Sequence, residues 1–299
     1  MEDRVDIKKV FTQTIDANWL REKNIVFDVL RLDAIHKNIS GNKWFKLKYY
    51  LQDAVENGFK TVATFGGAYS NHIIAMAAAC KNADLKSIGI IRGEGDVKLS
   101  HTLLYAQQLG MQLQFVSRLK YRDKESIKKI FTDAYCIDEG GYGSIGAKGA
   151  AEILGLSKFK TSYSHIICAV GTGTMMAGII QSANPGQQVI GISAMKGNDE
   201  LINKVSALLT DDCAEKQYHI EHLYHFGGYA KHPAELITYM NAVYTAHNLP
   251  TDIIYTAKVF YAIEQMVKNN DVPANSKVLM VHSGGLQGNL SLPNGKLYF

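Results

Sequence analysis

The stretch SHIICAVGTGTMMAG, residues 164–178, indicates how this chain folds. Residues 164–170 are mostly apolar and β-branched, as in a strand that is buried on both faces. Two glycines then permit a tight turn, and an apolar segment with helical spacing begins at Met175. A strand, a glycine turn and a helix in this order are typical of α/β proteins, in which ligands bind beyond the carboxyl ends of the strands.

The same alternation of short apolar runs and longer amphipathic segments continues along the chain. We expect strands at 25–32, 61–65, 87–92, 112–116, 134–137, 164–170, 188–193 and 277–282. We expect helices at about 42–57, 71–82, 98–109, 124–133, 145–155, 173–183, 198–208, 232–247 and 257–269. This order predicts an α/β fold with a parallel sheet that is covered by helices on both faces.

Composition and charge limit the class of protein. The chain has 299 residues, is 46% hydrophobic and 20% charged, and has a net charge of only +4, without a basic run that would suit nucleic acid. The N-terminal stretch lacks the apolar core of a signal peptide, and no apolar run reaches the roughly 18 residues that span a bilayer. The four cysteines are widely spaced, which fits a reducing compartment. We therefore expect a cytoplasmic protein that binds neither nucleic acid nor membrane.

The glycine turn within residues 170–178 is a candidate phosphate site. Gly171 and Gly173 allow close approach of the backbone, Thr172 and Thr174 add hydroxyl groups, and the next helix directs free N–H groups at the same point. A plain strand-to-helix turn would have the same glycines. The spacing is not G-x-G-x-x-G, no acidic residue ends the following strand, and a Walker sequence is absent, so a single phosphate fits better than a dinucleotide.

Two other clusters of polar residues need an explanation. In GGAYSNH, residues 66–72, Ser70 and Asn71 precede a helix, where they could cap it or bind a ligand carboxylate through the same N–H groups. In YHIEHLYH the histidines stand three apart, but HEXXH is absent and the segment suggests an irregular approach to a loop. We expect no metal site there.

The segment SGNKWFKLKYYL, residues 40–51, places Lys43 in the first turn of a helix for which Asn42 is the expected N-cap. The positive end of the helix dipole disfavours an ammonium group at this place. A neutral amine is the nucleophile that a Schiff base requires, although an exposed surface lysine would give the same sequence. Lys46, one turn later, is expected to share the face of Lys43.

Six segments of the chain, in order, resemble one enzyme family. They are GNKWFKLKYYL, FGGAYSNH, GYGSIGAKGAAEIL, VGTGTMMAG, DIIYTAKVFYAI and VHSGG, and they extend over about residues 25–290. They resemble the 1-aminocyclopropane-1-carboxylate (ACC) deaminase and D-cysteine desulfhydrase family, whose members use pyridoxal 5'-phosphate. The resemblance implies a tryptophan synthase β-subunit-like fold, a two-domain open parallel-sheet sandwich. It also implies a large domain of 1–44 and 150–299, an inserted small domain of 45–149, and a homodimer.

The resemblance assigns roles to individual residues. Lys43 matches the lysine that bonds covalently to the cofactor, and Asn71 matches the asparagine beside the cofactor's 3-hydroxyl group. Ser70 matches the serine that contacts the substrate carboxylate and assists proton transfer. The residues 171–174 match the phosphate cup. Tyr255 and, less closely, Tyr229 match two active-site tyrosines.

Two positions bear on the substrate, which the resemblance implies is a small amino acid. Thr256, at the pyridine nitrogen of the cofactor, stands where ACC deaminases have Glu, and Ser283 stands where they have Leu. Both changes favour β-elimination as in D-cysteine desulfhydrase over opening of the ACC ring. Trp44 and Phe45 replace smaller or basic residues beside Lys43 and are expected to narrow the pocket. The alternatives are an ACC deaminase, an oxidoreductase that binds a nucleotide, and a protein that holds the cofactor without turnover.

Overall fold

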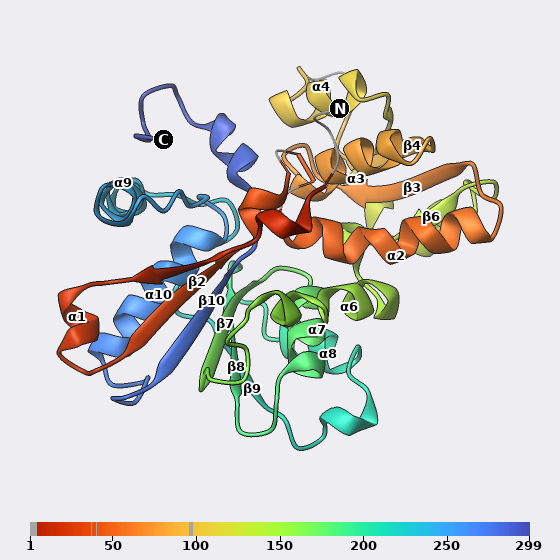
Figure 1. The fold of residues 1–299 in the computed structure, drawn as a ribbon. Coiled ribbons are helices and arrows are strands. Elements are labelled where there is room, and N and C mark those ends of the chain that lie inside the picture. The colour runs from red at the N-terminus through yellow and green to blue at the C-terminus, as the bar shows by residue number, and fades with distance from the viewer. Residues whose placement is uncertain (1–4, 37, 40, 96–97) are drawn as a thin grey trace.

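Two separate sheets organise the chain (Figure 1). The structure is a computed structural model that describes residues 5–36, 38–39, 41–95 and 98–299. The larger sheet has six strands in the order β1-β2-β10-β7-β8-β9, and the smaller has four in the order β5-β4-β3-β6. Every strand pair is parallel except β1 with β2. The α/β class and the parallel sheets that the sequence predicts are therefore confirmed.

The strands are short, and all except β1 and β9 follow the predicted apolar runs closely. In the larger sheet they are β1 (Thr12–Ile15), β2 (Val26–Arg31), β7 (His165–Val170), β8 (Gln188–Ser193), β9 (Gln217–Glu221) and β10 (Lys277–His282). In the smaller sheet they are β3 (Thr61–Gly66), β4 (Lys86–Arg92), β5 (Gln112–Val116) and β6 (Tyr135–Ile137).

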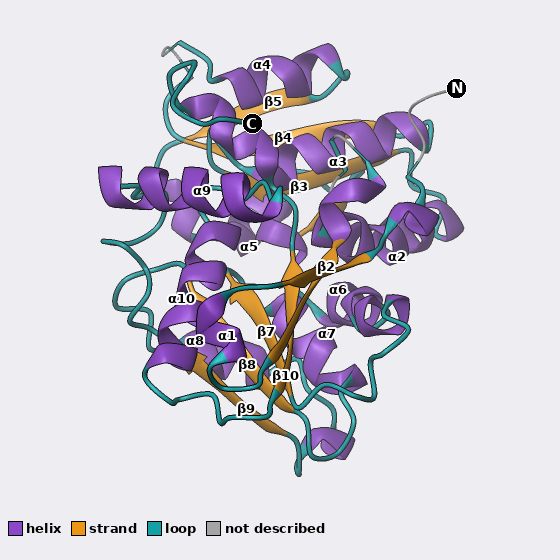
Figure 2. Cartoon of the chain, turned by 60° about the vertical axis from the view of Figure 1, so that its left-hand side comes forward, coloured by secondary structure: helices purple, strands orange, loops and turns teal. Residues whose placement is uncertain are grey.

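Helices surround both sheets, as the purple ribbons around the orange strands show in Figure 2. They are α1 (Asn18–Arg21), α2 (Asn42–Glu56), α3 (Asn71–Asn82), α4 (His101–Gln108), α5 (Lys124–Lys128), α6 (Ser144–Ala150), α7 (Thr174–Ser182), α8 (Leu201–Ser206), α9 (Ala234–His247) and α10 (Thr256–Lys268). Short 3-10 turns, such as the one at Leu286–Ser291, join some of these elements.

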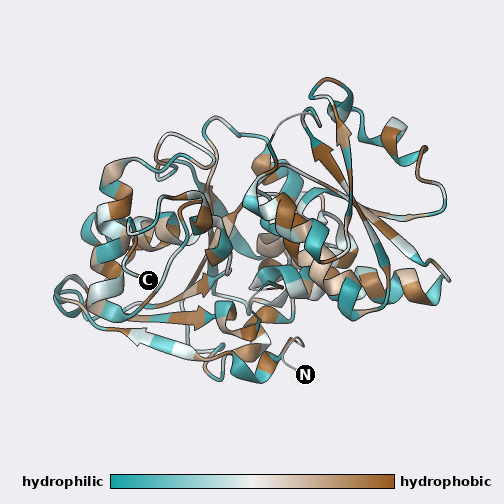
Figure 3. Cartoon of the chain, turned by 90° about the horizontal axis from the view of Figure 1, so that it is seen from above, coloured by the Kyte–Doolittle hydropathy of each residue, from teal (hydrophilic) through white to brown (hydrophobic). Residues whose placement is uncertain are grey.

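The larger sheet is covered on both faces because its central strand is apolar throughout. All six residues of β7 are buried, and successive side chains of a strand point to opposite faces. Ile166 and Cys168 pack into a core with α6 and α7, whereas Ile167 and Ala169 pack into a second core with α10. In Figure 3 brown, apolar segments occur both in the strands and in the helices that pack against them, among teal and white segments.

Helix α6 connects the surroundings of the two sheets. It contacts α2, which precedes the smaller sheet, and α7, which follows β7 of the larger sheet (Figure 1). Small residues allow this close packing: a Cβ added at Gly149 would lie 1.8 Å from the carbonyl oxygen of Phe45, and one at Gly178 would lie 2.5 Å from that of Ala147. Helix α6 therefore packs against both α2, which carries Lys43 in its first turn, and α7, which follows the glycine turn.

Some expectations about the elements are wrong. The first residues of YHIEHLYH, for which the sequence suggests an irregular approach to a loop, belong to the edge strand β9, and no sequence pattern predicts the edge strand β1. Both are partly exposed, so neither has the continuous apolar run that identifies the central strands. Helix α2 is capped by Gly41 and not by Asn42, which is already helical.

Candidate active site

The start of α2 lies directly against the turn that follows β10. The backbone N–H of Asn42 donates to the carbonyl oxygen of Ser283 at 3.1 Å. Gly41 has a φ of 65°, and a Cβ added there would lie 1.8 Å from the same oxygen, so only glycine fits. This contact fixes the first turn of α2, and with it Lys43, over the turn at 283–285.

The residue Lys43 is partly exposed, but its amine is buried, and among the described residues no carboxylate forms a hydrogen bond with it. Its Nζ donates to Oδ1 of Asn42 at 2.8 Å. Burial lowers the pKa of Lys43 to about 8, and the nearby charge of Asp252 opposes this shift. A substantial share of the amine is therefore neutral near physiological pH, as a nucleophile requires.

Lys46 lies one turn further along α2 and is only 4% exposed. Its Nζ donates to the carbonyl oxygen of Gly140 at 3.2 Å, and no carboxylate forms an ion pair with it in the part of the chain that is described. Burial holds its pKa well below the usual range, and the neighbouring Lys43 lowers it further. A bound anion would raise this pKa again and hold the amine as an ammonium group.

The glycine turn after β7 lies next to Lys46. A Cβ added at Gly140, the carbonyl partner of Lys46, would lie 2.8 Å from the methyl group of Thr172. Gly173 caps α7 with a φ of 93°, and the hydroxyl groups of Thr172 and Thr174 are 3.1 Å apart. The turn therefore presents two hydroxyl groups and the N-terminus of a buried helix close to a buried lysine, which is a suitable site for a phosphate group.

Ser70 and Asn71 lie at the start of α3. Ser70 is the N-cap, and its Oγ accepts from the backbone N–H of His72 at 3.3 Å. Asn71 is buried, and its Nδ2 is 3.5 Å from the carbonyl oxygen of Gly285. The capping role expected of Ser70 is thus present, and it leaves Asn71 facing the turn that also supports Lys43.

Tyr255 approaches the glycine turn from the start of α10. A Cβ added at Gly171 would lie 3.0 Å from its hydroxyl group. Burial raises the pKa of Tyr255 well above its usual range, and Tyr229 and Asp252 add to the rise, so the phenol keeps its proton at neutral pH. Tyr229 is 47% exposed, and its ring meets that of Tyr255 edge-on at 6.3 Å between centroids.

Asp252 organises the segment that carries Tyr255, and the sequence reasoning did not single it out. It is fully buried, and its carboxylate accepts from the backbone N–H groups of residues 254, 255 and 256 at 2.8–3.0 Å. The hydroxyl group of Thr256 donates to the same carboxylate at 2.7 Å and accepts from the backbone N–H of Asp252 at 2.6 Å. An Asp just before a predicted helix is a capping signal that could have identified it.

His72 is a second functional candidate that the sequence reasoning did not assign. Its Nε2 is 2.8 Å from Oγ of Thr64, whose own proton goes to the carbonyl oxygen of Ile137, so Nε2 carries the hydrogen. Its Nδ1 is buried and has no partner among the described residues. Burial, Lys43 and Lys46 hold the pKa of His72 well below its usual range. Nδ1 is therefore a bare acceptor close to both lysines.

Several features lie away from this site. Within the described ranges, no group of three or more His, Cys, Asp or Glu side chains could hold a metal ion, and His219 pairs with Glu221 at 3.2 Å instead. Phe45 is buried in the core, and Trp44 packs against it, so the expected narrowing of the pocket by these rings has no support. Among the same residues, no helix is long and apolar enough to cross a membrane.

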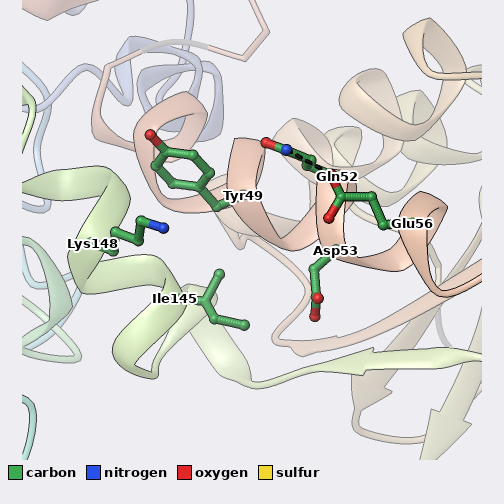
Figure 4. A pocket seen from close by; sticks show the side chains of 6 residues that line it. All are labelled: Tyr49, Gln52, Asp53, Glu56, Ile145 and Lys148. Carbon is green, nitrogen blue, oxygen red and sulfur yellow. Dashed lines mark hydrogen bonds between the residues drawn. The ribbon is translucent and has the colours of Figure 1, made fainter.

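Two hollows in the surface are also separate from the site. One of about 190 Å³ lies between α2 and α6, where Gln52 and Glu56 are hydrogen-bonded at 2.7 Å (Figure 4). A second of about 540 Å³ lies beyond the ends of β4 and β5. Neither hollow is lined by a residue that the sequence predicts for the active site. The candidate site is therefore identified by its functional side chains and not by a hollow in the surface.

The glycine turn and Lys43 both lie in the region that a known family profile matches. The profile is described as pyridoxal-phosphate dependent enzyme and covers residues 12–284. The chain belongs to this family. Its enzyme class and its cofactor, pyridoxal phosphate, follow from this membership.

Similar proteins carry two related names. A Thermotoga maritima protein, provisionally named an ACC deaminase, is 30% identical over 273 residues, which is 83% of this chain and 85% of the relative. An Arabidopsis thaliana protein named a bifunctional D-cysteine desulfhydrase and ACC deaminase is 27% identical over 87% of this chain and 72% of its own length. A crystal structure of an ACC deaminase homologue matches with a TM-score of 0.80 and 25% identity, covering 96% and 93% of the two chains.

The residues present fit pyridoxal phosphate. The buried amine of Lys46 has one hydrogen-bond partner among the described residues, a carbonyl oxygen, and it lies beside the glycine turn. A phosphate group bound between them would accept hydrogen bonds from both and hold the amine as an ammonium group. The lowered pKa of Lys43 leaves part of its amine neutral, and a neutral amine can react with the aldehyde group of the cofactor. Of the predicted residues, Lys43, Asn71, the turn at 171–174 and Tyr255 lie around this region. Thr256 faces Asp252 and Tyr229 lies at the outer edge, half-exposed.

Proposed function

We propose that this enzyme removes a β-substituent and the amino group from a small amino acid, as D-cysteine desulfhydrases do, giving pyruvate, ammonia and sulfide from D-cysteine. Support comes from the buried amine of Lys43 beside a turn that suits phosphate. The observation that carries the choice of reaction is the environment of Thr256.

Thr256 has one hydroxyl proton, and that proton is donated to Asp252. It therefore has no proton for the pyridine nitrogen of the cofactor, where a carboxylic acid could keep the ring protonated and strengthen its withdrawal of electrons. Loss of a thiolate from the β-carbon needs less electron withdrawal than opening of a cyclopropane ring. A threonine in this place is thus better suited to elimination.

We assign the chemical steps to residues as follows. When bound, pyridoxal phosphate supplies the electron sink that stabilises a negative charge on the α-carbon. Lys43 takes the α-proton with its neutral amine. The N-terminus of α3, with Ser70 and Asn71, binds the substrate carboxylate through N–H and side-chain donors. In this proposal Tyr255, which keeps its proton, donates a hydrogen bond to the leaving group.

ACC deaminase, which releases 2-oxobutanoate and ammonia, is the alternative that the names of the relatives favour. The same proposal includes a large domain of 1–44 and 150–299, an inserted small domain of 45–149, a homodimer and a cytoplasmic location. The domains and the homodimer rest on the family resemblance, and the location rests on the cysteine pattern. All four strands of the smaller sheet lie within 45–149, which supports those boundaries.

The proposal is tested with the purified holoenzyme and two substrates. We expect kcat/KM for sulfide release from D-cysteine to exceed that for 2-oxobutanoate release from ACC by at least about tenfold. Faster release of 2-oxobutanoate would instead assign the enzyme as an ACC deaminase. Absence of both products, with the cofactor bound, would favour a binding protein.

A double variant probes the two positions that distinguish the reactions. Thr256→Glu with Ser283→Leu is expected to raise ACC turnover relative to sulfide release, because it restores a carboxyl group at the pyridine nitrogen. The new carboxyl group would also face the buried Asp252, so a thermal melt must accompany the assay. Ser283→Leu alone is the control that leaves Thr256 in place. An unchanged ratio of the two activities in a folded double variant would contradict the assigned role of these positions.

A further inference from the structure

The loop at 225–230, between β9 and α9, has an unusual backbone. Positive φ values occur at Phe226 (51°), Gly227 (88°), Gly228 (122°) and Ala230 (56°). Two of these four residues have side chains, and such residues rarely adopt this conformation. Strain of this kind persists where surrounding contacts hold it, and it is frequent at functional sites.

Lys258 holds this loop from inside the molecule. This side chain is 1% exposed, and its Nζ donates to the carbonyl oxygens of His225 and Gly228, at 2.9 Å each. Among the described residues it forms no ion pair with a carboxylate. Burial of an ammonium group is costly unless hydrogen bonds compensate for it, and a methionine would fill a similar volume without that cost. The two bonds to the loop are therefore the polar contacts that account for a lysine here.

A second contact joins the same loop to the same helix. The ring of Phe226 meets that of Tyr261 edge-on, with 4.8 Å between their centroids. Lys258 and Tyr261 are three residues apart on α10, so their side chains share one face of that helix. One face of α10 thus contacts the loop through two hydrogen bonds from Lys258 and an aromatic contact from Tyr261.

The loop carries Tyr229, and Tyr255 is the N-cap residue of α10. The rings of these two tyrosines meet edge-on at 6.3 Å, and the hydroxyl group of Tyr255 lies beside Gly171 of the phosphate turn. Helix α10 therefore places Tyr255 directly and Tyr229 through the loop. We propose that Lys258 is a positioning residue, which holds the strained 225–230 loop so that Tyr229 stays against Tyr255 at the edge of the active site.

The catalytic part of this proposal rests on the proposed function, because it needs a measurable elimination. Lys258→Met is expected to release the loop and to lower kcat/KM for D-cysteine by about tenfold or more. Tyr229→Phe is expected to lower kcat/KM as well. If Lys258 acts through Tyr229, the double variant loses no more than about twofold beyond Tyr229→Phe alone. Multiplication of the two single effects would overturn the proposal. Lys268→Met is the matched control on α10, because Lys268 is exposed and pairs with Glu264.

Hydrogen exchange of the holoenzyme provides a readout that does not depend on activity. In Lys258→Met the backbone amides of 226–230 should exchange at least about tenfold faster than in wild type and in Lys268→Met, while those of β7 remain unchanged. Unchanged exchange in the loop would overturn the proposal even if activity fell. If Lys258→Met does not fold, Lys258→Gln takes its place, because the glutamine amide keeps a hydrogen-bond donor. In Lys258→Gln the backbone amides of 226–230 are expected to exchange faster than in wild type, but by less than about tenfold. Should D-cysteine and ACC both fail as substrates, the proposed function fails and the exchange result still decides the role of Lys258.

Discussion

Lys43 is suited to react near neutral pH because burial lowers its pKa to about 8. At pH 7.5 a lysine with this pKa is about one quarter neutral, whereas an unperturbed lysine is only about 0.1% neutral. The charge of Asp252 opposes the shift, and Asn42 accepts a hydrogen bond from either form of the amine. Near neutral pH Lys43 is therefore a mixture of the ammonium form and the reactive neutral amine.

This balance predicts how fast the cofactor-free protein captures added pyridoxal phosphate. Because the lowered pKa makes the neutral form appear as pH rises toward 8, the rate should climb about tenfold per pH unit below 8 and level off above it. The measurement is the growth of an absorbance band at about 410–420 nm, which borohydride should abolish. Lys43→Ala is the control and should form no such band. A rate that keeps rising to about pH 10 would show that the pKa of Lys43 is not lowered.

At the scale of an element, the start of α2 depends on the contact between Gly41 and Ser283. Gly41→Ala should lower the free energy of unfolding by at least about 2 kcal/mol, because alanine is strained at a φ of 65° and its Cβ would clash with a carbonyl oxygen. Gly58→Ala is the matched control just after the same helix, since Gly58 has a φ of 78° and open space around it. Denaturant unfolding measures both. Equal losses in the two variants would show that the Ser283 contact contributes nothing.

Sequence patterns predict the elements that are apolar and fail for those that depend on distant partners. The central strands, such as β7, were predicted because burial on both faces requires continuous apolar residues. The edge strands β1 and β9 are partly exposed and have no such signal. The turn at 171–174 is predicted from its local glycine motif, whereas the role of Lys43 is predicted only through the family resemblance, because its local pattern also fits a surface lysine. The tether from Lys258 to residues 225 and 228 joins positions about 30 apart in the chain, and no local pattern reveals it.

At the scale of the whole molecule, the candidate site draws on both sheets. Lys46 and Asn71 lie on helices beside the smaller sheet, whereas the turn at 171–174 and Tyr255 belong to the surroundings of the larger sheet. Helix α6 packs between α2 and α7 and so connects the two sides of the site. A cofactor that touches both sides should therefore bind the two halves together.

This arrangement predicts that pyridoxal phosphate stabilises the whole fold. A ligand that binds only the folded state at 100 times its Kd adds about 2.7 kcal/mol, which for a chain of this size corresponds to a rise in Tm of about 5 °C. Pyridoxal, which lacks the phosphate group, is the matched control, because it cannot engage Lys46 and the turn at 171–174. We expect its effect on Tm in thermal melts to be less than half of that of the phosphate form. If pyridoxal stabilised the protein equally, the glycine turn would not be the phosphate site, and the buried charge of Lys46 would need a different partner.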